Sequence, residues 1–155
     1  AESETEAIGW MTTLNREAAE AMQDIGVNAC TDVTGFGLLG HALEMAVGSG
    51  VIMEIDAARV PLITGVAELA GTGMIPAGSF ANRQFCERAV TVQPEVDPLL
   101  VDLLADAQTS GGLLISVAEE RYEALRAALE RRGVPCFSVG QVVETGQGAI
   151  RLKSS

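Results

Sequence analysis

The sequence predicts a layered α+β fold in which helices cover a mixed β-sheet. Helix-like and strand-like segments alternate along the chain, as they do in layered folds. The last two strand-like segments are separated only by a glycine-containing turn, which is typical of an antiparallel hairpin. At 155 residues and 48% hydrophobic composition, the chain has the size of one domain with its own core. We therefore expect a single domain over residues 1–155.

Each predicted element follows from hydrophobic periodicity and its flanking turn residues. Apolar residues at helical spacing predict a helix over residues 12–25, which Gly26 ends. A second long helix carries the apolar face that begins at Leu38, and Gly48 and Gly50 end it. The other expected helices cover residues 66–69, 98–105 and 119–131. The expected strands cover residues 28–31, 51–55, 89–92, 113–117, 136–143 and 149–152, with a Gly/Pro loop at 71–81 and a turn at 145–148.

The charge of the chain limits the partners that it can bind. Its net charge is −11, and Lys153 is its sole lysine, so no basic surface exists for a nucleic-acid backbone or an anionic membrane. A polyphosphate ligand would need Mg²⁺, backbone N–H groups or helix N-termini in place of lysines. No apolar run is long enough to span a bilayer, and no signal segment opens the chain. We expect a cytoplasmic protein.

The three cysteines favour neither a disulfide framework nor a zinc site. Cys30, Cys86 and Cys136 are odd in number, far apart and without a C-x-x-C pair. We expect them to be buried, reduced thiols.

The stretch from Thr31 to His41 has the features of an anion site, because a strand end turns through glycines into a helix. Gly35 and Gly37 allow a phosphate to approach the backbone, and Thr34 can cap the helix. Asp32 could hold a Mg²⁺ whose other ligands are phosphate oxygens and water. The structural alternative is an ordinary helix cap, with Asp32 as a second capping acceptor.

Several neighbouring residues have weaker claims to a role. Gly40-His41-Ala42 stands where a Walker A loop would have Gly-Lys-Ser/Thr, so this is not that motif. His41, the only histidine, is expected to be a hydrogen-bonded packing residue rather than a catalyst or metal ligand. In the second polar glycine loop, residues 106–112, Ser110 lacks a histidine partner, which favours a turn or a phosphate contact over a nucleophile. Asn82-Arg83 could bind an anion, although an exposed arginine is usually only solvated.

Three segments in a fixed order carry a family resemblance. They are Met11-Thr12-Thr13-Leu14-Asn15-Arg16, Ala29-Cys30-Thr31-Asp32-Val33-Thr34-Gly35-Phe36-Gly37-Leu38-Leu39-Gly40-His41 and Gln108-Thr109-Ser110-Gly111-Gly112-Leu113-Leu114-Ile115. On these residues the chain resembles selenophosphate synthetase, also called selenide, water dikinase. That family makes selenophosphate from selenide, ATP and water, releases AMP and phosphate, and uses Mg²⁺. The resemblance implies a fold similar to the carboxy-terminal domain of aminoimidazole ribonucleotide synthetase, a layered α/β/α arrangement.

The resemblance also implies roles for the residues of the first loop. It assigns a metal role to Asp32 and an ATP-positioning role to Thr34, Gly35, Phe36 and Gly37. It assigns no catalytic residue to this chain, because the family's reactive cysteine or selenocysteine, with its nearby lysine, belongs to an amino-terminal segment that is absent here. ATP and selenide would be bound together with that missing domain. The full-length enzyme is implied to be a homodimer, whereas the isolated chain is expected to be inactive and is compatible with a monomer.

Two other functions are compatible with the sequence. The chain could be a non-catalytic assembly module, or the same domain of a sister enzyme such as aminoimidazole ribonucleotide synthetase, thiamine-monophosphate kinase or a hydrogenase maturation factor. An exposed apolar patch beside Asp32 would favour half of a phosphotransferase, and one on the opposite face would favour an assembly module. The family's usual proline is replaced by Ala107, a departure that affects the turn more than the assignment.

Overall fold

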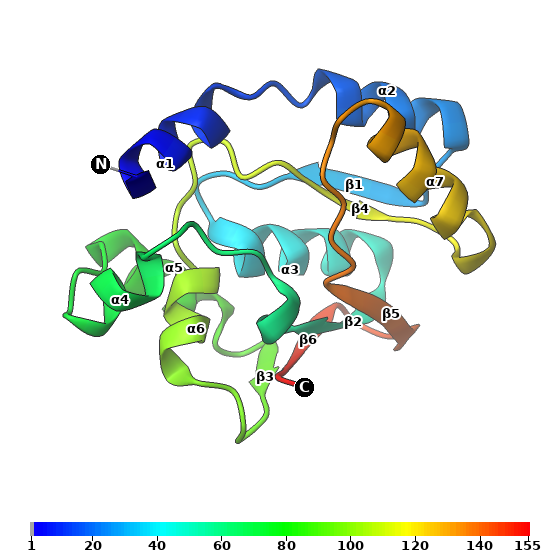
Figure 1. Cartoon of the computed structure of the whole chain (residues 1–155). Helices are drawn as coiled ribbons and strands as arrows, with labels where there is room; N and C mark the ends of the chain where they lie inside the picture. The colour runs from blue at the N-terminus through cyan, green and yellow to red at the C-terminus, as the bar shows by residue number, and fades with distance from the viewer. Residues whose placement is uncertain (1) are drawn as a thin grey trace.

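The computed structural model describes residues 2–155, which form helices and strands in alternation (Figure 1). The helices are α1 (Glu2–Thr12), α2 (Arg16–Ile25), α3 (Gly37–Ser49), η1 (Ala57–Arg59, a 3-10 helix), α4 (Val66–Gly71), α5 (Ala77–Cys86), α6 (Pro98–Leu104) and α7 (Glu119–Arg131). The strands are β1 (Ala29–Asp32), β2 (Val51–Asp56), β3 (Val90–Val92), β4 (Leu113–Ser116), β5 (Gly140–Thr145) and β6 (Ala149–Lys153). Among these residues, no helix is long and apolar enough to cross a membrane.

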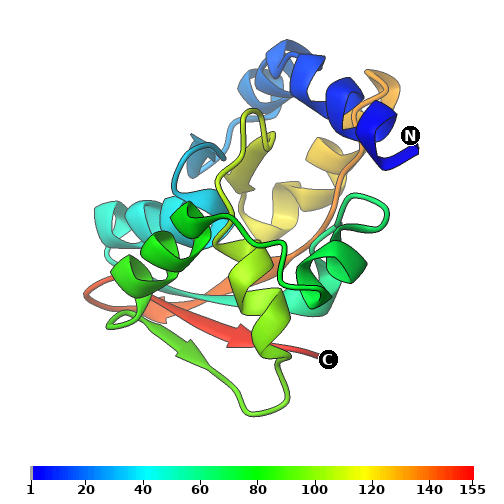
Figure 2. The ribbon, with the colours of Figure 1, turned by 90° about the vertical axis from the view of Figure 1, so that its left-hand side faces the viewer.

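The strands form two sheets separated by helix α3. β1 and β4 make an antiparallel pair, and the other strands make a mixed sheet in the order β3-β6-β2-β5. Helices α2 and α7 cover the outer side of the β1–β4 pair, and α3 lies between that pair and the larger sheet (Figure 1). The turned view shows α5 and α6 on the same side of the larger sheet as α3 (Figure 2). The predicted α+β class with a mixed sheet is confirmed.

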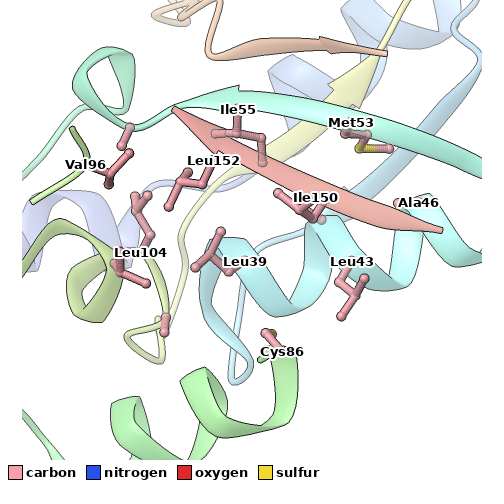
Figure 3. Close-up of a cluster of buried hydrophobic side chains, with 14 residues drawn as sticks. Leu39, Leu43, Ala46, Met53, Ile55, Cys86, Val96, Leu104, Ile150 and Leu152 are labelled. Carbon is pink, nitrogen blue, oxygen red and sulfur yellow. The ribbon is translucent and has the colours of Figure 1, made fainter. Parts of the chain in front are cut away.

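The main core lies between α3 and the four-stranded sheet. Period-2 alternation points Met53 and Ile55 of β2, and Ile150 and Leu152 of β6, toward the apolar face of α3 around Leu39 (Figure 3). A smaller cluster joins α2, α7 and β4. Because α3 packs against β1 on one side and the larger sheet on the other, its amino-terminal end is fixed beside the end of β1.

The predicted hairpin at the end of the chain is wrong. β5 and β6 do not pair with each other, because β2 lies between them, antiparallel to β5 and parallel to β6. The turn between them lies beside the junction of α3 and β2, where the Gly146 amide donates to the Gly50 carbonyl over 2.9 Å. The connection therefore crosses the end of β2 instead of folding back on itself.

Two local predictions differ from the structure in their bounds. The helix expected over residues 12–25 ends at Ile25 before Gly26, as expected, but it begins only at Arg16, since the Thr12 and Thr13 hydroxyls bond back to carbonyls of the last turn of α1. The segment 71–81, expected to be a loop throughout, contains the start of α5, which begins at Ala77 directly after Pro76.

Candidate functional site

Asp32 is the last residue of β1 and lies at the end of the β1–β4 pair. Its register partner is Leu113, and the residue is exposed. No hydrogen bond or ion pair between described residues involves its carboxylate. Nor do residues 2–155 contain a group of three or more His, Cys, Asp or Glu side chains that could hold a metal ion. A free carboxylate is a hard oxygen donor that suits Mg²⁺, so this chain can supply one ligand and not a complete site.

The two glycine loops that the sequence presents separately form one structural unit. Beyond Asp32, the Val33 amide donates to the Gly112 carbonyl over 3.0 Å, and the Gly111 amide donates to the Val33 carbonyl over 2.9 Å. The Gln108 amide donates to the Thr34 carbonyl over 2.9 Å. These bonds extend the β1–β4 pairing into the loops, so the chain after Asp32 is held by backbone contacts.

The glycines of the first loop differ in what surrounds them. Gly37 has a φ of +67°, and a Cβ there would lie 2.6 Å from the carbonyl carbon of Ala105 and 2.7 Å from the Asp106 oxygen. Gly37 is therefore required by the contact between the loops. Gly35 is exposed, and nothing lies within 4 Å of its Cβ position. Of the two, Gly35 is the one that leaves the backbone open to a ligand.

The first turn of α3 has no side-chain cap, contrary to the expectation for Thr34. The residue at the N-cap is Phe36, and it makes no capping hydrogen bond. The Thr34 hydroxyl instead lies 3.1 Å from Nε2 of His41, while its carbonyl accepts from Gly37. His41 is a hydrogen-bonded, buried residue, as expected. The start of α3 thus keeps the partial positive charge of a helix N-terminus without a side-chain oxygen to satisfy it.

Helix α5 is hydrogen-bonded to both loops, and the sequence did not predict these contacts. The Asn82 amide donates to the carbonyls of Gly35 and Ala105 over 2.9 and 3.0 Å. The Ser79 hydroxyl, fully buried, donates to Asp106 over 2.6 Å. Ser79, Asn82 and Cys86 have the i, i+3, i+7 spacing of one helix face, and this was the signal that could have revealed the helix.

Arg83 does not offer a free guanidinium to an anion. It forms an ion pair with the buried carboxylate of Asp102, with an N–O distance of 2.6 Å. The guanidinium of Arg83, which the sequence suggested could bind an anion, therefore already pairs with a carboxylate inside the domain.

An exposed aromatic surface adjoins the first loop. The rings of Phe36 and Phe85 stack with centroids 5.9 Å apart, and these residues are 45% and 62% exposed. Phe80, also on α5, is 52% exposed. This apolar surface lies in the loop that follows Asp32 and on helix α5, whose Asn82 is hydrogen-bonded to that loop. Exposed apolar residues also occur on and after α1, at Ile8, Trp10, Met11 and Leu14.

The cysteines offer no activated nucleophile beside this loop. Burial raises the pKa of the Cys30 thiol, and the nearby negative charge of Asp32 raises it further. The thiol therefore stays protonated near neutral pH. All three cysteines are free, as expected. Of the three, Cys86 is buried, Cys30 is only partly buried, and Cys136 is exposed because the segment before β5 lies at the surface.

The class of this protein follows from the fold and the loop together. Residues 2–153 match the family described as "AIR synthase related protein, C-terminal domain", and the chain belongs to that family. Two relatives named "Selenide, water dikinase" are similar to it. The one from Nitratidesulfovibrio vulgaris (strain Miyazaki F) is 46% identical, and the match covers 96% of this chain and 43% of the relative. The one from Caldanaerobacter subterraneus subsp. tengcongensis is 49% identical, and the match covers 95% of this chain and 43% of the relative. The resemblance seen in the sequence is confirmed.

The chain spans less than half the length of these relatives. Among solved structures, it resembles "Crystal structure of E. coli HypE, a hydrogenase maturation protein", with a TM-score of 0.60 and 24% identity over 92% of this chain and 37% of that one. This similarity shows a shared fold.

Proposed function

We propose that this chain is the carboxy-terminal domain of a selenide, water dikinase and forms one wall of its Mg²⁺-ATP site. The similar relatives carry that name, and the residues on which the chain resembles that family include one continuous segment from Thr31 to His41. The reaction is the transfer of a phosphoryl group from ATP to selenide, with water consumed and AMP and phosphate released. We place the enzyme in the cytoplasm and expect the complete protein to be a homodimer.

The observation that carries the proposal is the free carboxylate of Asp32 beside a rigid loop. Asp32 would bind Mg²⁺, which neutralises polyphosphate charge, and Gly35 would let a phosphate approach the backbone. Thr34, Phe36 and Gly37 would fix the position of that backbone, because each is tied to α3 or to the second loop. These residues bind and orient the substrate and carry out no proton or covalent transfer.

By itself the chain is expected to be inactive and to bind Mg²⁺-ATP weakly. Phosphoryl transfer is promoted chiefly by positioning and charge, so half of the ligand set gives little stabilisation. The nucleophile, the remaining metal ligands and the contacts to selenide would come from the amino-terminal part of the enzyme.

The test is Asp32→Asn in the complete enzyme that contains this chain. We expect a large loss of selenide-dependent AMP formation and a higher Mg²⁺ requirement, since the amide keeps the shape but loses the charge. Glu95→Gln is a matched control, because Glu95 is exposed and has no hydrogen-bond or ion-pair partner among residues 2–155. Unchanged activity and Mg²⁺ requirement in Asp32→Asn would refute the proposal.

A further inference from the structure

His41 is a buried imidazole with a partner on each ring nitrogen. It lies in the first turns of α3 and is only 8% exposed. Its Nε2 lies 3.1 Å from the Thr34 hydroxyl and 3.4 Å from the Phe36 amide nitrogen, and its Nδ1 lies 3.0 Å from a carboxylate oxygen of Glu44. The ring therefore connects the glycine loop to a charged side chain one helical turn further along.

These contacts determine where the proton sits. The Phe36 amide can only donate, so Nε2 must be an acceptor, and the Thr34 hydroxyl donates to the same nitrogen. The carboxylate of Glu44 can only accept, so Nδ1 must carry the proton. The arrangement selects the neutral Nδ1–H tautomer, with Glu44 fixing it.

We propose that His41 is a positioning residue that holds the Thr34–Phe36 segment in the conformation that receives the phosphates. Asn82 donates to the Gly35 carbonyl of this segment, and His41 contacts the Thr34 hydroxyl and the Phe36 amide. The inference rests on the proposed function of the loop, and it assigns the role to a residue that touches neither metal nor nucleotide in that proposal.

Packing alone does not account for this residue. A leucine could fill the buried space that the ring occupies on α3. The imidazole adds an acceptor at a place where the loop presents two donors. Burying a polar ring is favourable only when its hydrogen bonds are made, and both nitrogens of His41 are satisfied.

The first test is the tautomer, which can be read from long-range ¹H–¹⁵N correlation spectra of the 155-residue chain. The chain has a single histidine, so one imidazole spectrum is observed and needs no assignment by mutation. We expect the Nδ1–H form, and a shift toward a tautomer mixture in Glu44→Ala. A wild-type ring with its proton on Nε2 would overturn the inference, because Nε2 could not then accept from Phe36.

The second test compares His41→Gln with His41→Leu in the complete enzyme. Both side chains fill similar space, but only the glutamine oxygen can accept from the Phe36 amide. We expect His41→Leu to raise the KM for Mg²⁺-ATP about tenfold, as expected for the loss of one or two hydrogen bonds. The kcat should change less than KM, and His41→Gln should retain most of the wild-type KM.

The outcomes separate this inference from the proposed function. If Asp32→Asn raises the Mg²⁺ requirement but the leucine and glutamine variants have equal KM values, the role of His41 is refuted and the site stands. If Asp32→Asn has no effect while the Nδ1–H tautomer is observed, the loop contacts stand and the Mg²⁺-ATP site is refuted. A thermal unfolding midpoint measured for each variant shows whether a change in KM reflects a general loss of folding.

Discussion

Replacing Gly37 by alanine should weaken the contact between the two glycine loops. The φ of +67° is unfavourable for alanine, and the added Cβ would lie 2.6–2.8 Å from backbone atoms of Ala105 and Asp106. Ala105 is fully buried and cannot move without disturbing the core. The left-handed backbone costs about 1–2 kcal/mol and the weakened hydrogen bond from Gln108 to Thr34 about 1 kcal/mol, so we expect a loss of about 2–3 kcal/mol.

Gly35→Ala is the control for this prediction. It adds the same methyl group two residues away, where nothing lies within 4 Å and φ is not in the left-handed region. We expect its unfolding free energy to stay within about 0.5–1 kcal/mol of the wild type. Urea unfolding followed by circular dichroism measures both variants. Equal unfolding free energies for Gly37→Ala and Gly35→Ala would refute the reasoning that Gly37 is a packing requirement.

Three further predictions concern Asn82, the thiols and the helix pair α2–α7. Asn82→Ala leaves the carbonyls of Gly35 and Ala105 without their donor, so the unfolding free energy measured by urea titration should fall by about 1–3 kcal/mol. Gln84 is exposed, so Gln84→Ala should change this free energy little. Iodoacetamide should modify exposed Cys136 before buried Cys86, as measured by mass spectrometry, and earlier labelling of Cys86 would contradict this order. Burial raises the pKa of the Cys86 thiol, so stability should fall as pH rises above about 8.5, where the unfolded thiol ionises. Arg132→Ala should lower the melting temperature, because it removes the ion pairs from the end of α7 to α2. The difference in melting temperature between wild type and variant should shrink in high salt, and a salt-independent difference would point to packing instead.

The sequence predicted the elements of the site better than their assembly. The loop containing Asp32 and the loop at residues 106–112 both carry local turn chemistry, so each could be recognised from its own residues. Their pairing depends on backbone hydrogen bonds between Val33 and Gly111–Gly112. Backbone bonds do not require particular side chains, so the sequence shows no sign of this pairing apart from the glycines themselves. Helix α5 was missed for a similar reason. The Gly and Pro residues around its start predict a loop, although Asn82 and the residues at helical spacing from it form one helix face.

The wrong hairpin at the end of the chain has a similar cause. The turn at residues 145–148 has the glycines that a hairpin needs, and nothing local distinguishes it from a turn that crosses another strand. What decides the topology is the fit of β2 between β5 and β6, where Ile55 and Leu152 face the same core. A contact between segments about a hundred residues apart thus overrides the local signal.

Asp32 combines an unpaired carboxylate with a neighbouring loop that backbone hydrogen bonds hold in place, and this combination is our reason to regard it as a ligand. Asp102 is paired with Arg83, Asp106 accepts from Ser79, and Asp56 accepts from the Ala58 amide. Asp32 has no such partner among the described residues, although the loop behind it is held by backbone bonds on both sides.

A rigid, unpaired carboxylate in a chain of net charge −11 repels ATP unless a cation intervenes. Arg83, on helix α5, cannot serve, because it already neutralises Asp102. The proposed site therefore requires the metal for binding as well as for chemistry, and ATP without Mg²⁺ should bind more weakly to the wild type than to Asp32→Asn. Equilibrium binding of ATP to the complete enzyme with Mg²⁺ and with EDTA measures this inversion, and the same order of affinities in both conditions would show that Asp32 does not face the phosphates.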